Sequence, residues 1–167
     1  MNPKAVAFVA VKSGTGKTTL LTQVIAELKK RGRKVGALKH ASEGFEMDHP
    51  GKDSHRMTVA GADTVVVRSN ERIAMIKSDP REIPVTEIIK GYFGDVDIVL
   101  VEGFRKSDLP KIEVHRANAG TELLCRGEKN DPCLVAVASD LSMDLDVPVL
   151  DLNRPWDVAD FIEKKFL

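Results

Sequence analysis

The chain has 167 residues, of which 43% are hydrophobic and 30% are charged. This composition predicts one globular domain with a single core over residues 1–167. Lysine and arginine together number 25, and aspartate and glutamate also number 25. No excess of positive charge therefore favours nucleic acid or a membrane surface as partner, and small molecules or other proteins are expected instead.

The first apolar run, Ala5–Val11, is too short to span a bilayer and lacks a small-residue cleavage site. It continues directly into a polar loop, so we expect a cytoplasmic protein. Cys125 and Cys133 are the only cysteines and lack the spacing of a metal site. Two reduced thiols are the simplest interpretation.

The stretch Ala5–Leu28 is typical of a strand, a phosphate-binding loop and a helix. After the loop, apolar residues recur at helical spacing at Leu20, Leu21, Val24, Ile25 and Leu28. Three cations, Lys29–Arg31, precede Gly32 and suit the negative end of a helix. The opposite end would present unpaired N–H groups and partial positive charge, which favour a polyphosphate.

The loop itself supplies the chemistry of a nucleotide site. Gly14 and Gly16 would let the backbone curl around phosphate oxygens, Lys17 would reach the β- and γ-phosphates, and Thr18 would ligate Mg²⁺. Val11 departs from the pattern G-x-x-x-x-G-K-[ST], which has glycine at that position. The predicted nucleotide-binding residues of this stretch are Lys12, Ser13, Gly14, Thr15, Gly16, Lys17, Thr18 and Thr19.

Lys12 has two interpretations. The run Lys12–Thr18 resembles the variant loop K-G-G-x-G-K-[ST] of dimeric signal-recognition, MinD-like and BioD-like NTPases. In those proteins the first lysine can reach the nucleotide of the partner subunit. A plain surface lysine at a strand end is the alternative.

Val35–Leu38 predicts a second, parallel strand, with Lys39 and His40 at the edge where open α/β sheets bind ligands. The following segment, 41–53, reads as a mobile polar loop. Asp48 is a candidate catalytic residue that could position water or Mg²⁺, or it could simply form a turn. Asp53 or Ser54 is predicted to cap a helix running to Ala60.

Two further stretches complete the first two thirds of the fold. Thr64–Arg68 and Arg72–Ile76 are joined by a connection too short for a crossover helix, which predicts an antiparallel hairpin. Pro84–Phe93 predicts a helix with Val85, Ile88 and Ile89 facing inward.

The run Asp97–Phe104 is continuously apolar until Glu102, which predicts a strand buried on both faces. An acid at the carboxyl end of such a strand, next to a phosphate loop, would hold Mg²⁺ or its water. Glu102 is therefore the second candidate catalytic residue and, with Thr18, a candidate metal ligand.

The C-terminal third predicts two strands, a short edge strand at Val147–Asp151 and a helix. Lys111–His115 alternates like a strand with one wet face, and Cys133–Ala138 reads as buried. Asp140 follows that strand and could either select guanine or serve as a helix cap or turn residue. Pro155–Phe166 is predicted to turn Trp156, Ala159, Ile162 and Phe166 inward. The whole pattern indicates a P-loop NTPase of class α/β, a three-layer sandwich with a mostly parallel sheet and an added antiparallel hairpin.

Taken together, the motifs resemble the MobB family of molybdopterin-guanine dinucleotide biosynthesis adaptor proteins over nearly the full length. The matching stretches are Ser13–Thr19, Leu38–His40, Met47–Ser54, Ala60–Ala62, Leu100–Phe104 and Lys111–Glu113. The resemblance implies a homodimer with an extended sheet that binds GTP with Mg²⁺ and hydrolyses it weakly. It also implies assistance to molybdopterin guanylyltransferase, the enzyme that joins GMP to molybdopterin.

Two other functions start from the same residues. A small P-loop kinase would usually carry an arginine-rich lid, whereas the loop at 117–132 contains a single arginine, Arg126. A metal-delivery NTPase is suggested by His40, His49 and His55, although their spacing is not that of a tight metal site.

Overall fold

The computed structural model describes residues 4–79, 81–120, 122–127 and 130–167. The chain forms two compact units. The sheet unit comprises Met1–His40 and Pro84–Leu167, and the hairpin unit comprises Ala41–Ile83. The assignment of residues 1–167 to a single domain stays a prediction.

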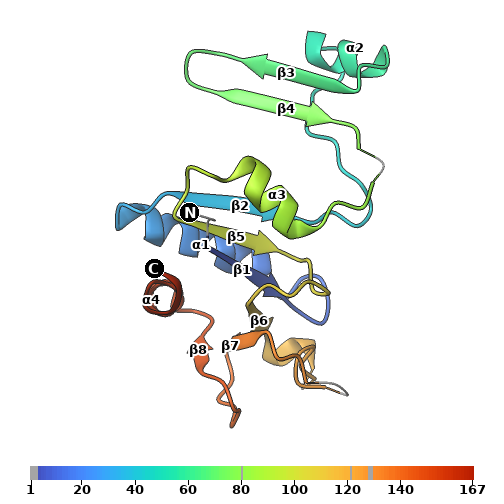
Figure 1. Cartoon of the computed structure of the whole chain (residues 1–167). Helices are drawn as coiled ribbons and strands as arrows, with labels where there is room; N and C mark the ends of the chain where they lie inside the picture. Colours follow the sequence, from blue (N-terminus) through green and yellow to red (C-terminus); the bar gives the residue numbers. More distant parts are fainter. Residues whose placement is uncertain (1–3, 80, 121, 128–129) are drawn as a thin grey trace. The chain divides into compact units, whose positions relative to one another are not determined.

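A six-stranded sheet forms the centre of the sheet unit, with the order β2-β5-β1-β6-β7-β8 (Figure 1). All of its neighbouring strands pair in parallel. All six carboxyl ends therefore lie along one edge, the carboxyl edge of the sheet. The strands are β1 (Lys4–Val9), β2 (Val35–Lys39), β5 (Ile98–Glu102), β6 (Lys111–His115), β7 (Leu134–Ser139) and β8 (Val149–Asp151).

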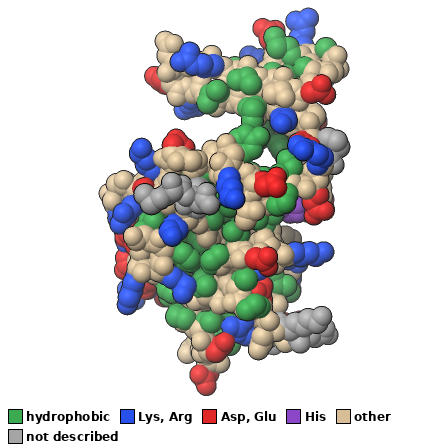
Figure 2. All heavy atoms as spheres, in the orientation of Figure 1, with side chains coloured by type: hydrophobic (Ala, Val, Ile, Leu, Met, Phe, Trp, Pro, Cys, Tyr) green, Lys and Arg blue, Asp and Glu red, His purple; other side chains and the backbone are tan. Residues whose placement is uncertain are grey.

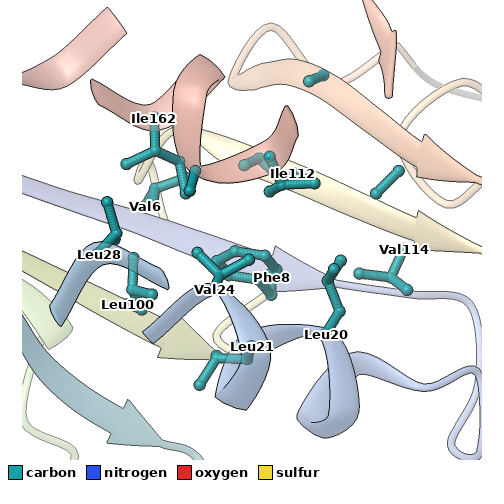
Figure 3. Close-up of a cluster of buried hydrophobic side chains, with 14 of the residues drawn as sticks. Val6, Phe8, Leu20, Leu21, Val24, Leu28, Leu100, Ile112, Val114 and Ile162 are labelled. Atoms are coloured by element: carbon teal, nitrogen blue, oxygen red, sulfur yellow. The ribbon is translucent and has the colours of Figure 1, made fainter. Parts of the chain in front are cut away.

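Helices cover both faces of this sheet. One core cluster joins Val6 and Phe8 of β1 to the buried faces of α1 (Lys17–Lys30) and α4 (Pro155–Phe166), as Figure 3 shows. The other cluster joins Ala7 and Val9 of β1 to α3 (Val85–Tyr92). Successive residues of a strand point to opposite faces, so this alternation gives three layers. The α/β three-layer fold predicted above is thereby confirmed.

The expected wet face of β6 is wrong, since all five of its residues are buried. The carboxylate of Glu113 accepts the backbone N–H groups of Leu124 at 2.5 Å and Cys125 at 2.9 Å. The Lys111 ammonium pairs with Asp131 at 2.8 Å. These polar side chains bond to the loop that covers the sheet instead of to water, which satisfies them in a buried position. That loop begins with a short 3₁₀ helix, η1 (Ala117–Ala119).

Helix α4 also differs from its prediction at one position. Ala159 and Ile162 are buried, but Trp156 is 47% exposed and packs beneath the Arg154 guanidinium, 5.6 Å from the ring centroid. The side chain of Arg31, at the end of α1, links that helix to α4 through hydrogen bonds. There Arg31 bonds Glu27, Asp160, Glu163 and the Trp156 carbonyl.

The hairpin unit contains α2 (Asp53–Val59) and the antiparallel strands β3 (Thr64–Arg68) and β4 (Ile73–Lys77). This confirms the added hairpin. The predicted cap is wrong, because Lys52 occupies the N-cap of α2 and no side chain caps it. Hydrophobic side chains lie on the surface of this unit (Figure 2), and those on its strands are Val66, Val67, Ile73 and Met75.

Across the described ranges, no helix combines the length and apolarity needed to cross a membrane.

Candidate functional site

The phosphate-loop sequence lies between the end of β1 at Val9 and the start of α1 at Lys17. Gly14 and Gly16 adopt φ angles of 79° and 90°. This left-handed backbone is open to glycine but strained for other residues. Such a turn presents successive backbone N–H groups to an anion at the positive end of a helix. The local geometry thus has the features that a phosphate needs.

Lys17 lies at the mouth of this loop. Its Nζ donates to the Lys12 carbonyl at 3.2 Å. Burial lowers the pKa of Lys17 from 10.5, while the Glu102 carboxylate raises it and the cations Arg105 and Lys39 lower it further. A lysine surrounded by other cations gains from the arrival of a polyphosphate, because the anion neutralises that repulsion.

Glu102, at the end of β5, contacts the start of α1 and the end of β2. Its Oε2 accepts the Thr18 hydroxyl at 2.8 Å, and its Oε1 accepts the Lys39 ammonium at 3.0 Å. The carboxylate side chain is only 14% exposed. A hydroxyl and a carboxylate are oxygen donors of the kind that Mg²⁺ prefers. The two predicted metal residues are therefore in direct contact and fit a magnesium–nucleotide site.

The backbone after Glu102 is tightly constrained. Gly103 and Phe104 both have positive φ angles, 93° and 52°. A Cβ on Gly103 would lie 3.2 Å from the Cβ of His40. The His40 ring packs on Phe104 with a centroid distance of 4.8 Å, and the His40 N–H donates to the Glu102 carbonyl at 2.9 Å. His40 therefore has a packing role at the end of β5.

Arg116 is a residue that the sequence reasoning did not single out. It follows β6, and its Nε donates to the Thr15 carbonyl inside the phosphate loop at 3.2 Å. Its Nη1 faces Asp140 at 3.9 Å. The signal that could have found it is a cation placed directly after a buried parallel strand.

Asp140 has defined contacts of its own. Its Oδ1 accepts the Ala117 N–H at 2.8 Å, and its Oδ2 faces Arg116. Both interpretations of Asp140 from the sequence, a contact with guanine and a helix cap or turn, stay predictions. Thr15 is 3% exposed, and its hydroxyl has no hydrogen-bond partner within the described ranges.

The other predicted residues are distributed as follows. Lys12, Ser13 and Thr19 are exposed around the loop. Asp48 belongs to the hairpin unit, where the Ser54 hydroxyl and the His49 N–H hold the pKa of its carboxyl below 3.8. Its catalytic role stays a prediction.

Beside the loop lies a cavity of about 1030 Å³, whose walls include Val11, His115, Leu123, Leu141 and Met143. Val11, which replaces the glycine of the usual pattern, therefore forms part of a wall. The His115 ring is already bonded to Ser139 Oγ at 3.0 Å and to the Gly120 carbonyl at 2.8 Å. Its hydrogen bonds are thus taken up by the protein.

The histidines that suggested a metal-delivery site, His40, His49 and His55, do not form a cluster of metal ligands among the described residues. His40 lies in the sheet unit, and His49 and His55 lie in the hairpin unit. Within residues 4–79, 81–120, 122–127 and 130–167, no group of three or more His, Cys, Asp or Glu side chains is arranged to hold a metal.

Comparison with known proteins places this geometry in a family. Residues 5–140 match the model of MobB, described as molybdopterin guanine dinucleotide synthesis protein B. The chain is 38% identical over 159 residues to the molybdopterin-guanine dinucleotide biosynthesis adapter protein of Escherichia coli, covering 92% of this chain and 88% of that protein. The adapter protein of Haemophilus influenzae is 37% identical over 152 residues, with coverage of 90% and 83%.

Solved structures agree on the fold. Bacillus subtilis MobB superposes with a TM-score of 0.74 at 23% identity, covering 97% of this chain and 98% of that one. The crystal structure of a molybdopterin-guanine biosynthesis protein B (mobB) gives a TM-score of 0.70 at 26% identity, covering 96% of this chain and 98% of that one. The resemblance drawn from the sequence motifs is thus confirmed, and the chain belongs to the MobB family.

Proposed function

We propose that this chain is a GTP-binding adapter protein of molybdopterin-guanine dinucleotide biosynthesis that hydrolyses GTP slowly with Mg²⁺. The family and the names of its relatives support the biosynthetic role. One observation carries the nucleotide chemistry. The Thr18 hydroxyl, at the start of α1, touches the strand-end carboxylate of Glu102 at 2.8 Å.

The residues of the loop have distinct tasks in this proposal. Backbone N–H groups between Gly14 and Lys17 bind phosphate oxygens, and the Lys17 ammonium neutralises the outer phosphates. Thr18 and Glu102 hold Mg²⁺ directly or through its water. The ion offsets charge on the phosphates when bound. Glu102 also orients water near the terminal phosphate.

Turnover without an activator is expected to be slow, roughly 10⁻⁴ to 10⁻² s⁻¹, as in other P-loop GTPases that lack one. Asp140 is our candidate for guanine selection, because its carboxylate lies at the carboxyl edge after β7. In that role Asp140→Asn weakens GTP binding and favours xanthosine triphosphate.

The partner of this adapter is proposed to be molybdopterin guanylyltransferase, and the working form a homodimer. The hairpin unit supports the second point. Its two-stranded sheet leaves unpaired strand edges, beside hydrophobic side chains that are about half exposed or more. Asp48 to Ser54 would contact the guanylyltransferase, with charges that tune association.

Parallel titration with Mg²⁺-GTP and Mg²⁺-ATP tests the nucleotide proposal. At a hundredfold excess over Kd, bound GTP should stabilise the chain by about 2.7 kcal/mol. At this chain length that raises the melting temperature by about 5–10 °C. Lys17→Ala should lose most of the shift, because the outer phosphates lose their cation. At saturating Mg²⁺, Glu102→Gln should keep the shift and lose nearly all hydrolysis.

Two results would contradict the proposal. An unchanged melting shift in Lys17→Ala would move the nucleotide away from this loop. Wild-type hydrolysis by Glu102→Gln would remove Glu102 from the reaction.

A further inference from the structure

Arg116 touches the phosphate loop from a different strand, and this contact has no part in the function proposed so far. Its Nε donates to the Thr15 carbonyl at 3.2 Å. The same Nε would lie 3.2 Å from a Cβ placed on Gly16, so the guanidinium packs closely against the loop backbone. The Arg116 side chain is 34% exposed, which leaves this contact only partly screened by water.

The contact fixes one peptide unit of the loop. A trans peptide is planar, with its C=O and N–H pointing in opposite directions. Holding the Thr15 carbonyl therefore also sets the direction of the Gly16 N–H. That N–H is one of the donors with which a loop of this type binds phosphate.

This peptide needs such a restraint. Thr15 lies between Gly14 and Gly16, and both glycines adopt positive φ angles. Glycine loses more backbone entropy on ordering than any other residue, so a loop with two of them resists adopting one conformation. A charge-assisted hydrogen bond to the carbonyl between them offsets part of that entropy.

Arg116 is itself oriented. Its Nη1 faces Asp140 Oδ2 at 3.9 Å, and the other oxygen of that carboxylate accepts the Ala117 N–H at 2.8 Å. The contact thus runs from the end of β7, through Asp140 and Arg116, to the loop that follows β1.

We infer that Arg116 is a positioning residue that holds the phosphate loop in its nucleotide-binding conformation through the Thr15 carbonyl. This inference rests on the proposed nucleotide site and adds a determinant of its affinity. Because Arg116 acts through the backbone, its loss affects nucleotide binding more than the stability of the unliganded fold.

The test compares Arg116→Met with wild type in calorimetric titrations with a non-hydrolysable GTP analogue and Mg²⁺. Arg116→Met should bind about tenfold more weakly, which corresponds to ~1.4 kcal/mol. The melting temperature of the unliganded chain should stay within about 2 °C of wild type, as for a surface substitution. Arg116→Lys, which keeps a donor and the charge, should recover part of the affinity.

A second measurement separates positioning from a general structural role. In Arg116→Ala, millimolar guanidinium ion should restore part of the affinity by occupying the vacated place beside the Thr15 carbonyl. Arg154→Met is the matched control. It removes an arginine that pairs with Asp157 at 3.1 Å elsewhere in the sheet unit, and its affinity should equal that of wild type.

The outcomes distinguish this inference from the proposal beneath it. A wild-type chain that binds no nucleotide would overturn the proposed function and the inference together. A wild-type chain that binds, beside an Arg116→Met variant of equal affinity, would overturn the inference alone. A large fall in unliganded melting temperature with unchanged affinity, or no rescue by lysine and guanidinium, would show a structural role and overturn it as well.

Discussion

Lys39 is the residue whose charge bears most directly on the proposed magnesium site. Its ammonium holds Glu102 Oε1 at 3.0 Å, while the other oxygen of that carboxylate accepts the Thr18 hydroxyl. A divalent cation approaching Glu102 therefore competes with a cation that is already bound. The lysine side chain is 61% exposed, so the competition is modest.

Substituting Lys39 should lower the magnesium requirement. With the ion pair worth about 0.2–1 kcal/mol, Lys39→Met should reduce the Mg²⁺ concentration for half-maximal GTP binding by up to about fivefold. A Mg²⁺ titration at fixed GTP measures this. Lys34→Met, directly before the first residue of β2, is the control. A higher requirement in Lys39→Met would mean that Lys39 supports the ion.

Single residues of the candidate site also show which contacts can be predicted from the sequence. Thr18 touches Glu102, and the Glu102 charge reaches Lys17, because the phosphate loop and the strand-end acid follow two strands that pair in parallel. Arg116 was missed, since its partner is a backbone carbonyl about a hundred positions away. Its place directly after a buried parallel strand was the available signal, but that place does not reveal which backbone group the side chain contacts.

Among the elements, β6 shows how a correct strand can be given the wrong surroundings. Its alternating polar residues predicted exposure to water, as in a half-buried strand. Instead Glu113 accepts the backbone N–H groups of Leu124 and Cys125, and Lys111 pairs with Asp131, so protein groups take the place of water there. Side-chain periodicity gives the face on which a residue lies, but not what covers that face. The prediction that Trp156 faces inward was wrong for a related reason. An aromatic residue at the right helical spacing can still lie at the edge of the core, partly exposed to water.

The contact between α1 and α4 should contribute to stability through Arg31. Its guanidinium bonds Glu27, Asp160 and Glu163 together, so Arg31→Met leaves three carboxylates without their shared cation. We expect a loss of about 1–2 kcal/mol, or roughly 2–8 °C in melting temperature. Lys29→Met, on the same helix, provides a control for the loss of one charge.

The effect should depend on pH. Arg31 and Arg33 hold the pKa of Glu163 below its ordinary 4.5. A carboxyl with a lowered folded pKa stabilises the fold above 4.5, and this stabilisation is lost as pH falls through the folded value. The difference between wild type and Arg31→Met should therefore shrink in melts below pH 4.5. A constant difference would exclude Glu163 as the partner that matters.

For the whole molecule, the proposed dimer is the property to test. If strand edges of the hairpin unit pair between two chains, light scattering should give twice the monomer mass. Ile73→Lys places a charge on an apolar residue of β4 that is 71% exposed, and should shift the chain toward monomer. Asn70→Lys, in the turn, adds the same charge and should not. A monomeric wild type would refute the dimer.

The strand order of the sheet unit also governs how the chain can fold during synthesis. Strands β1 and β2 are made first, but β5 lies between them, and neither pairs with the other. The first hydrogen-bonded ladder of the central sheet must therefore await Ile98–Glu102, after the whole hairpin unit has emerged. Each doubling of a connection adds only about 0.6 kcal/mol of closure entropy, so the inserted unit costs little stability. Its main effect is on timing, because non-local pairing of this kind slows folding and leaves the apolar β1 strand unpaired until β5 arrives.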